Sequence, residues 1–277
     1  MRKLTLALAL LAMFSGPVFA IYAHASEPVD KTLYPGDSVD VGKAGPGQTV
    51  YLIVDRATDG GTCPNNFCPD GWDTVVGVED GIPHGWEVEA SPLQETPMKL
   101  KIKIAPDAEE GQYNLTLAVV DEGNYNGLGN MTIHAIVTVS RDVFEITVTP
   151  TRVETGVGQP AVYYIKIRNT GAASDPFEIK VREGDLPVWN YKKTALVNYG
   201  SERTIPYEVV LDEEAERTFT IDVTSLSSSQ IHKEMSVIVD SRPDIVTDWK
   251  ATTHGLMMFP ILEAPIYAIV GLLSQLL

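Results

Sequence analysis

The sequence has few cysteines, few basic residues and no convincing amphipathic helix before its last segment, and each shortage excludes a class of protein. Two cysteines occur among 277 residues, and the five histidines are scattered along the chain, so the four clustered ligands of a structural zinc site are not expected. Lys and Arg total 21 against 37 Asp and Glu, which gives a formal net charge of −16. Such an acidic exterior repels phosphate backbones, so we expect no nucleic-acid partner.

Recognisable catalytic motifs are also missing. The chain has no nucleophile elbow, no phosphate-binding glycine loop and no helix carrying a His-Glu metal motif. Adjacent carboxylates occur at Glu109-Glu110 and Glu213-Glu214, but neighbours in an extended chain face opposite ways and make a poor acid–base couple. We therefore predict a protein that is not an enzyme and binds no cofactor. A secreted enzyme is the least supported alternative.

The N-terminus has the three-part layout of a secretory signal peptide. The basic pair Arg2-Lys3 is followed by an apolar run from Leu4 to about Phe14. Small-residue cleavage motifs then occur at Val18-Phe19-Ala20 and at Ala23-His24-Ala25. The apolar run is shorter than the about 20 residues that a retained transmembrane anchor needs. We expect a signal peptide over residues 1–25, with the exact cleavage site left open.

Both cysteines lie in the segment "GGTCPNNFCPDGWD" (residues 60–73). Cys63 and Cys68 enclose four residues in a loop rich in Gly, Pro and Asp. A redox site favours two intervening residues within an α/β fold, and neither feature is present. Exported chains meet oxidising conditions. We therefore predict a Cys63–Cys68 disulfide that shapes this loop and stabilises the fold by only about 2 kcal/mol.

Strand signals dominate the chain between its two ends. Runs rich in β-branched and aromatic residues are bounded by clusters of Gly, Pro, Asn and Asp. The run "LKIKI" (100–104) alternates strictly between apolar and charged residues, as a half-exposed strand does. Strands are predicted in the first half at 48–56, 98–106, 113–121 and 131–140, and in the second half at 143–150, 161–171, 175–183, 203–212, 216–225 and 234–241.

Short strands with turn signals about every 8 to 12 residues are typical of β-sandwiches. We therefore predict an all-β chain with two tandem immunoglobulin-like β-sandwich domains plus one C-terminal transmembrane helix. The first sandwich is expected over residues 26–141 and the second over residues 142–242. No long flexible spacer separates them.

Tyr113 stands where an acidic turn leads into a strand, in "PDAEEGQYNLTLAVVD" (106–121). Two interpretations remain open for it. In a tyrosine corner, the ring is buried and the hydroxyl returns to upstream backbone, as in Greek-key sandwiches. In the other interpretation, Tyr113 is an ordinary buried tyrosine of a strand.

Residues 255–277 read "GLMMFPILEAPIYAIVGLLSQLL" and are predicted to form a transmembrane anchor, preceded by a juxtamembrane linker at 243–254. A helix of this length spans about 34 Å, enough for a hydrocarbon core of about 30 Å. Two prolines would kink it, Glu263 is ionisable, and no Lys or Arg follows. Glu263 lies either at the outer interface or against a partner inside the membrane. An apolar core helix of a soluble protein is a third option.

Polar residues suggest modification or cation binding at two places. Asn114-Leu115-Thr116 and Asn130-Met131-Thr132 match the N-glycosylation acceptor pattern, and strand alternation points Asn114 outward. The loop "VVDEGNYNGLGN" (119–130) gathers oxygen ligands of the kind that calcium prefers, but it lacks the spacing of an EF-hand. No metal site is predicted, and the weak calcium candidates are Asp121, Glu122, Asn124 and Asn126.

The second half resembles the CARDB-type immunoglobulin-like modules of archaeal and bacterial surface proteins. The resemblance lies in "TPTRVETGVGQPAVYYIKIRNTGAASDPFEIKVRE" (149–183), where an Asn-Thr-Gly turn joins two strands, and in "LDEEAERTFTIDVTS" (211–225). It covers about residues 143–241 and, more weakly, 29–140. Its motifs carry turns and core positions and no catalytic set. It implies an extracellular sandwich used for spacing, adhesion or assembly.

These observations predict a membrane-anchored extracytoplasmic glycoprotein with a non-enzymatic structural, adhesion or assembly role at the cell surface. It would contact the membrane through its C-terminal helix and other surface or membrane proteins through its sandwiches. The alternative is an extracytoplasmic accessory subunit of a multi-subunit membrane enzyme or transporter, docked through that helix. Replacing Glu263 by leucine would separate the two hypotheses, because only the second predicts loss of a co-purifying complex.

Overall fold

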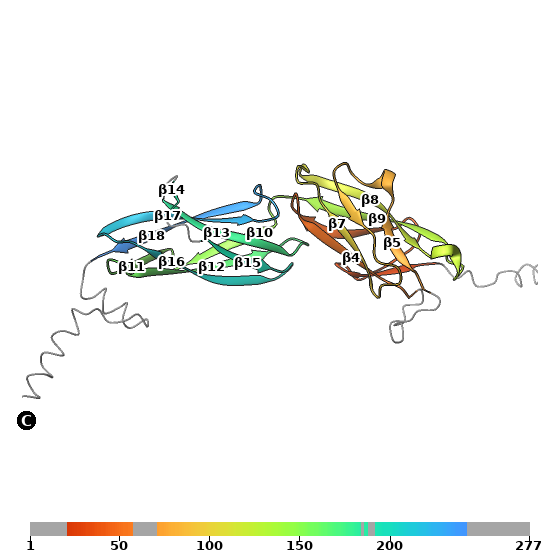
Figure 1. The fold of residues 1–277 in the computed structure, drawn as a ribbon, viewed down its shortest axis with the longest axis horizontal. Helices are drawn as coiled ribbons and strands as arrows, with labels where there is room; N and C mark the ends of the chain where they lie inside the picture. The colour runs from red at the N-terminus through yellow and green to blue at the C-terminus, as the bar shows by residue number, and fades with distance from the viewer. Residues whose placement is uncertain (1–20, 58–70, 184–185, 188–191, 243–277) are drawn as a thin grey trace, which may run out of the picture. The chain divides into compact units, whose positions relative to one another are not determined.

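The computed structural model describes residues 21–57, 71–183, 186–187 and 192–242, and the chain divides into two compact units between Ser140 and Arg141 (Figure 1). The all-β prediction is confirmed for this part of the chain. It contains 18 strands and two one-turn 3-10 helices, at Glu79–Gly81 and Glu122–Asn124. Each unit is described by itself below.

The first unit consists of two sheets. One has the strand order β2 (Lys31–Leu33), β1 (Ala23–Glu27), β4 (Thr49–Asp55), β7 (Met98–Lys103), β6 (Glu87–Glu89). The other has the order β3 (Ser38–Ala44), β9 (Asn130–Val139), β8 (Gly111–Val120), β5 (Thr74–Gly77). The orders β1-β4-β7-β6 and β9-β8-β5 match the A-B-E-D and G-F-C sheets of an immunoglobulin constant-type sandwich. The first unit is therefore an immunoglobulin-like β-sandwich.

Alternation along the strands explains why these residues form a sandwich. In β9 every second side chain from Met131 to Val139 is buried, while the intervening ones are half-buried or exposed. Period-two burial places one face of each strand in the core and the other toward solvent. Trp72, two residues before the start of β5, is fully buried. Immunoglobulin sandwiches carry a buried tryptophan on the corresponding strand.

The second unit also consists of two sheets, one of three strands and one of six, where the first unit has five and four. One sheet has the order β10 (Phe144–Thr149), β12 (Pro160–Asn169), β16 (Glu202–Val210). The other has the order β11 (Arg152–Thr155), β18 (His232–Ser241), β17 (Ala215–Ser225), β13 (Asp175–Glu183), β14 (Leu186–Pro187), and β15 (Lys193–Val197) also pairs with β13. The two units share two pairings. The first strand of each pairs antiparallel within one sheet, β1 with β4 and β10 with β12. A later strand pairs in parallel with the last strand of the other sheet, β3 with β9 and β11 with β18.

The core of the second unit draws side chains from both sheets. The rings of Phe144 and Phe177 are fully buried, with centroids 4.7 Å apart. The hydroxyl of Tyr163 on β12 donates to the carbonyl oxygen of Ile238 on β18 at 2.7 Å, which links the two sheets. Burial raises the pKa of the Tyr163 phenol, so it remains a donor over the physiological range.

The hydroxyl contact of a tyrosine corner is present at Tyr113, whose side chain is half-buried. Its hydroxyl donates to the carbonyl oxygen of Glu109 at 3.0 Å, and its ring centroid lies 5.1 Å from that of Trp86. Tyr113 sits near the start of β8, the strand that corresponds to strand F, where such corners are found. The contact fixes the turn between β7 and β8.

The expected start of the first sandwich at residue 26 is wrong, because Ala23–Glu27 form β1, with Ala23 and Ala25 fully buried.

Within the described residues, no helix is long and apolar enough to cross a membrane. The expected anchor at 255–277 lies outside those residues, as do Cys63, Cys68 and Glu263.

Candidate functional site

The β8–β9 loop (residues 121–129) joins two long strands of the first unit by an irregular path (Figure 1). It begins with the 3-10 turn Glu122–Asn124 and contains four residues with positive φ angles. Three of them are glycines, which adopt this conformation without steric cost, and the fourth is Asn124. The glycine and asparagine content of "DEGNYNGLG" therefore encodes a tight, irregular path.

Asp121 holds this loop from inside. Its side chain is buried, at 2% exposure, and Oδ2 accepts the backbone N–H groups of Asn126 and Leu128, each at 3.0 Å. Asn124 Oδ1 accepts the N–H of Gly129 at 2.9 Å. Because charge-assisted bonds from backbone donors are stronger than neutral ones, the carboxylate fixes the far half of the loop on its base.

A buried ion pair supports the near half. Arg56 and Asp73 have side chains only 5% and 10% exposed, and Arg56 Nη2 lies 3.3 Å from Asp73 Oδ1. Arg56 Nε donates to the carbonyl oxygen of Trp72 at 2.6 Å. The second carboxylate oxygen, Asp73 Oδ2, accepts the N–H of Glu122 at 3.0 Å. The ion pair thus connects the end of β4 and the start of β5 to the β8–β9 loop.

A further contact joins the same segments. Asn126 Nδ2 donates to the carbonyl oxygen of Gly71 at 2.8 Å. In immunoglobulin variable domains, the loops between strands B and C and between F and G form part of the antigen-binding end. Here the β4–β5 connection and the β8–β9 loop occupy those positions. The predicted Cys63–Cys68 disulfide belongs to the same connection but lies outside the described residues.

The loop presents one aromatic side chain to solvent. Tyr125 is 89% exposed, and its ring lies over Gly123, where a Cβ would approach Tyr125 Cε2 to 2.7 Å. Gly123 also has a φ of +68°, so both its backbone and its space favour glycine. A large, half-apolar side chain held at the tip of a fixed loop is suited to contact with another macromolecule.

The four calcium candidates do not gather into a ligand set. Asp121 and Asn124 use side-chain oxygens to accept backbone N–H groups, and Asn126 donates its amide to Gly71. Asp121 Oδ1 has no hydrogen-bond partner among the described residues, and Glu122 is exposed. No group of three or more His, Cys, Asp or Glu residues in the described part of the chain is placed to hold a metal ion.

The two glycosylation candidates lie at opposite ends of the β8–β9 hairpin. Asn114 is exposed on β8 opposite Ile136, and Asn130 is exposed at the start of β9 opposite Val120. Both side chains are on the solvent side of their strands, so neither sequon is excluded by burial.

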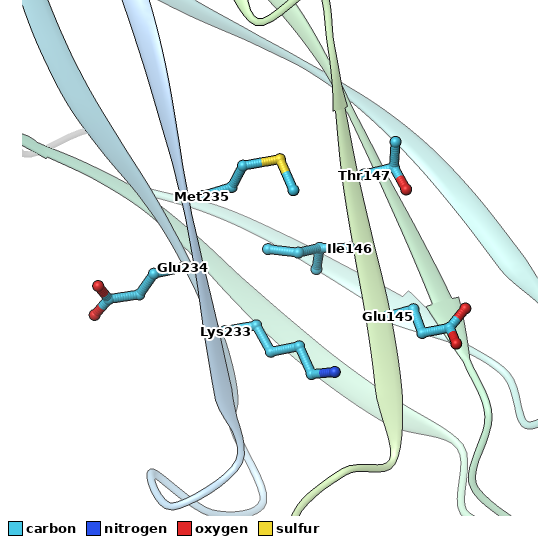
Figure 2. A pocket seen from close by; sticks show the side chains of 6 residues that line it. All are labelled: Glu145, Ile146, Thr147, Lys233, Glu234 and Met235. Atoms are coloured by element: carbon cyan, nitrogen blue, oxygen red, sulfur yellow. The ribbon is translucent and has the colours of Figure 1, made fainter.

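A shallow hollow of about 500 Å³ lies in the second unit between β10 and β18. Figure 2 shows Ile146 and Met235 pointing toward each other across it, while Glu145 and Glu234 point away. Lys233 also lines the hollow, but its Nζ is 2.6 Å from Asp142 Oδ1 and 5.7 Å from the Phe144 ring centroid. Its charge is therefore already paired, and the hollow offers no convergent polar groups for a small ligand.

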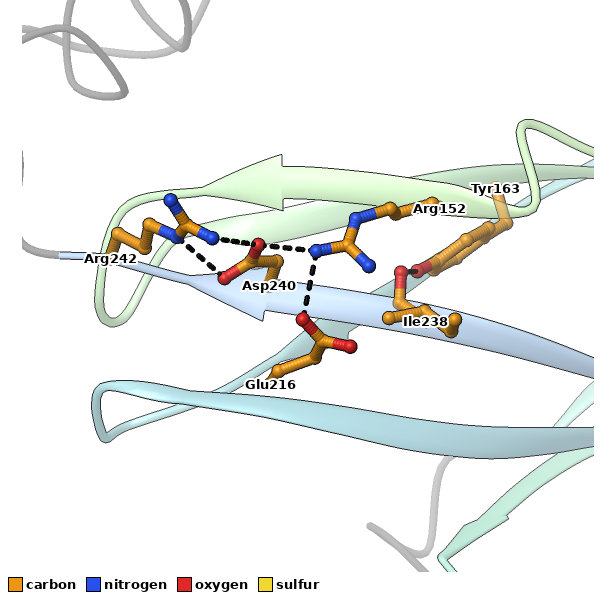
Figure 3. A network of polar contacts seen from close by, with 6 residues as sticks. All are labelled: Arg152, Tyr163, Glu216, Ile238, Asp240 and Arg242. Atoms are coloured by element: carbon orange, nitrogen blue, oxygen red, sulfur yellow. Dashed lines mark hydrogen bonds and ion pairs between the residues drawn. The ribbon is translucent and has the colours of Figure 1, made fainter.

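Another buried carboxylate, that of Asp240, lies near the end of β18, the last described strand of the second unit. Asp240 is 3% exposed and pairs with Arg242 Nη2 at 2.8 Å and Arg152 Nη2 at 2.6 Å, and Arg152 Nη2 also contacts Glu216 Oε2 at 2.8 Å (Figure 3). Hydrogen bonds from Arg242 and then Arg152 lower the pKa of Asp240, against the opposing effect of its burial. This network ties the short strand β11 to β18 and β17.

Asp240 makes the stability of the second unit depend on pH. A carboxylate whose pKa is lowered by folding stabilises the fold above its unfolded pKa, about 3.9, and that contribution is lost as the pH falls through the folded value. We expect Asp240→Asn to lower the urea midpoint at pH 6 and the difference from the unmodified protein to shrink below about pH 4. Asp212→Asn, in an exposed turn, is the control. A difference that stays constant down to about pH 2.5 would contradict this assignment.

Sequence reasoning found the β8–β9 loop but not its supports. The buried pair Arg56–Asp73 carries no local signal, because the two residues lie 17 positions apart in the sequence. The exposure of Tyr125 carries no local signal either. The sequence does show a single arginine, Arg56, directly after the apolar strand in "YLIVDR". That position alone does not predict a buried ion pair, because the partner Asp73 is placed beside Arg56 only by the fold.

Comparisons with known proteins assign the chain to no family. No family model matches the chain, and no curated protein matches it. Among solved structures, fibronectin(III)-like modules of Clostridium thermocellum CbhA are 12% identical, with 79% of this chain and 94% of that chain covered and a TM-score of 0.26. A titin segment is 11% identical, with coverage of 80% and 100% and a TM-score of 0.27.

A β-glucosidase from Listeria innocua in complex with glucose is 15% identical over 35% of this chain, with a TM-score of 0.26. The chain covers only 16% of the length of that enzyme. The description of the units as immunoglobulin-like therefore rests on their own strand orders. In the second unit, β10-β12-β16 and β18-β17-β13 correspond to the A-B-E and G-F-C orders, while β15 pairs with β13.

Proposed function

We propose that this chain is an extracytoplasmic, membrane-anchored immunoglobulin-like protein with a structural, adhesion or assembly role at the cell surface. The N-terminal signal and the apolar segment 255–277 support export and anchoring. The net charge of −16 keeps the exterior soluble and repels nucleic acid. The predicted disulfide and the exposed sequons at Asn114 and Asn130 suit an oxidising, extracytoplasmic environment.

The single observation that carries the proposal is the fixed β8–β9 loop with Tyr125 at its tip. Ordering a loop before contact reduces the entropy lost on binding. Tyrosine is enriched among the residues that contribute most to protein–protein affinity. Asp121, Asp73 and Asn126 supply that order through hydrogen bonds to or from backbone groups. We infer that this loop docks another surface or membrane protein.

Tyr125→Ser tests the docking role. Partner recovered with the unmodified protein from mildly solubilised native membranes is expected to bind the variant at least about 30-fold more weakly, which corresponds to a hot-spot loss of about 2 kcal/mol. Tyr51→Ser is the matched control, because Tyr51 is 44% exposed on the outer face of β4. Equal affinities for both variants and the unmodified protein would contradict the proposal. The melting temperature, measured in parallel, is expected to change little for either variant, because both side chains lie on the surface and outside the core.

A further inference from the structure

The first strand of the structure contains one of the two sequence motifs that a signal peptidase could recognise. Ala23-His24-Ala25 has the small residues of an A-x-A site, yet these residues form the start of β1. Ala23 and Ala25 are both 0% exposed. Packing in the core therefore accounts for the small size of Ala23 and Ala25, and a role in processing is not needed to explain it.

Strand pairing in the first unit depends on these residues. Ala23, His24 and Ala25 pair with Leu33, Thr32 and Lys31, and these three pairs are the whole described ladder between β1 and β2. β2 is the edge strand beyond β1, so it has no other strand to pair with in the described sheet. A chain beginning at Ser26 would lose that ladder and expose the buried side chain of Leu33.

Side-chain contacts add to the same conclusion. Trp72 Nε1 donates to the carbonyl oxygen of Tyr22 at 3.0 Å, and the Trp72 side chain is fully buried. His24 Nε2 lies 3.3 Å from Asp30 Oδ1 and 3.9 Å from Asp55 Oδ2. Removing residues 21–25 would leave the buried indole N–H without its acceptor, which is a costly state for a polar group.

We infer that the signal peptide is removed between Ala20 and Ile21, at Val18-Phe19-Ala20, and not after Ala25. This inference rests on the proposed export of the chain. Hydrolysis of the Ala20–Ile21 peptide bond by one water molecule leaves a carboxylate on Ala20 and an amino group on Ile21. The mature chain then keeps Tyr22 and the whole of β1. The new N-terminal residue, Ile21, is 39% exposed, so its amino group is not forced into the core.

The test is the intact mass and N-terminal sequence of the protein recovered from native membranes, after removal of any glycans. A chain that begins at Ile21 supports the inference. A chain that begins at Ser26 overturns it while leaving export intact. A chain that retains Met1 and is recovered from the cytosol overturns both the inference and the proposed export.

Two variants make the assignment specific. Ala20→Leu removes the small residue before the inferred cut and is expected to lose the Ile21 N-terminus and accumulate precursor. Ala25→Val removes the small residue at the competing motif and is expected to yield the same Ile21 N-terminus as the unmodified protein. Both are read on denatured protein, so a folding defect does not obscure the result. Loss of processing in Ala25→Val, with normal processing in Ala20→Leu, would overturn the inference.

Discussion

Replacing Asp73 by alanine is expected to destabilise the first unit by about 3–5 kcal/mol, the usual cost of leaving one member of a buried ion pair uncompensated. The guanidinium of Arg56 would remain buried and, among the described residues, would keep only the carbonyl oxygen of Trp72 as an acceptor. The N–H of Glu122 would also lose its acceptor. Urea unfolding followed by the fluorescence of the buried Trp72 and Trp86 would measure the change.

A double replacement separates stability from loop order. Arg56→Met with Asp73→Leu exchanges the ion pair for apolar side chains, a change that is often neutral or stabilising in buried pairs. It still removes the acceptor of the Glu122 N–H. We expect the double variant to regain most of the stability while the Glu122 amide exchanges its hydrogen faster than in the unmodified protein. Unchanged protection of that amide would show that Asp73 does not order the loop. Glu89→Ala, which breaks an exposed ion pair with Lys101, is the control.

Phe177→Ala is expected to cost the second unit about 3–5 kcal/mol, because it combines lost burial with a cavity in a packed core. The Phe177 ring is fully buried beside that of Phe144. Tyr164→Ala provides the matched control: it removes an aromatic ring that is 53% exposed on the outer face of β12. Chemical unfolding of both variants should show a large shift in midpoint for the first and a small one for the second. Similar shifts would contradict the assignment of Phe177 to the core.

The sequence predicts the central strands well because each carries its own period-two signal. β4, β7, β8 and β9 lie within or next to the predicted runs, as do the long strands of the second unit. The strands β2, β5, β6, β11, β14 and β15 were missed, because two to five residues give too little alternation to stand out, and the longer β3 was missed as well. β1 was missed for another reason: its small alanines fit a cleavage motif as well as they fit a crowded core.

The candidate site was predictable only in part. The composition of residues 119–130 marks an irregular polar loop, but the same oxygens suit calcium and backbone capping equally. Which role applies depends on partners distant in sequence: Gly71 and Asp73 lie about 50 residues before the loop atoms that they contact. Tyr113 shows the opposite case, because its hydroxyl bonds only four residues upstream and a local motif sufficed.

Surface labelling of intact cells tests the central claim most directly. A membrane-impermeant amine reagent should modify exposed lysines on both sandwiches, such as Lys101, whose side chain is 42% exposed, and Lys166, at 45%. The labelled protein should stay with the membrane pellet after an alkaline carbonate wash. Protein that is unlabelled in intact cells and recovered in the soluble cytosolic fraction would contradict the account.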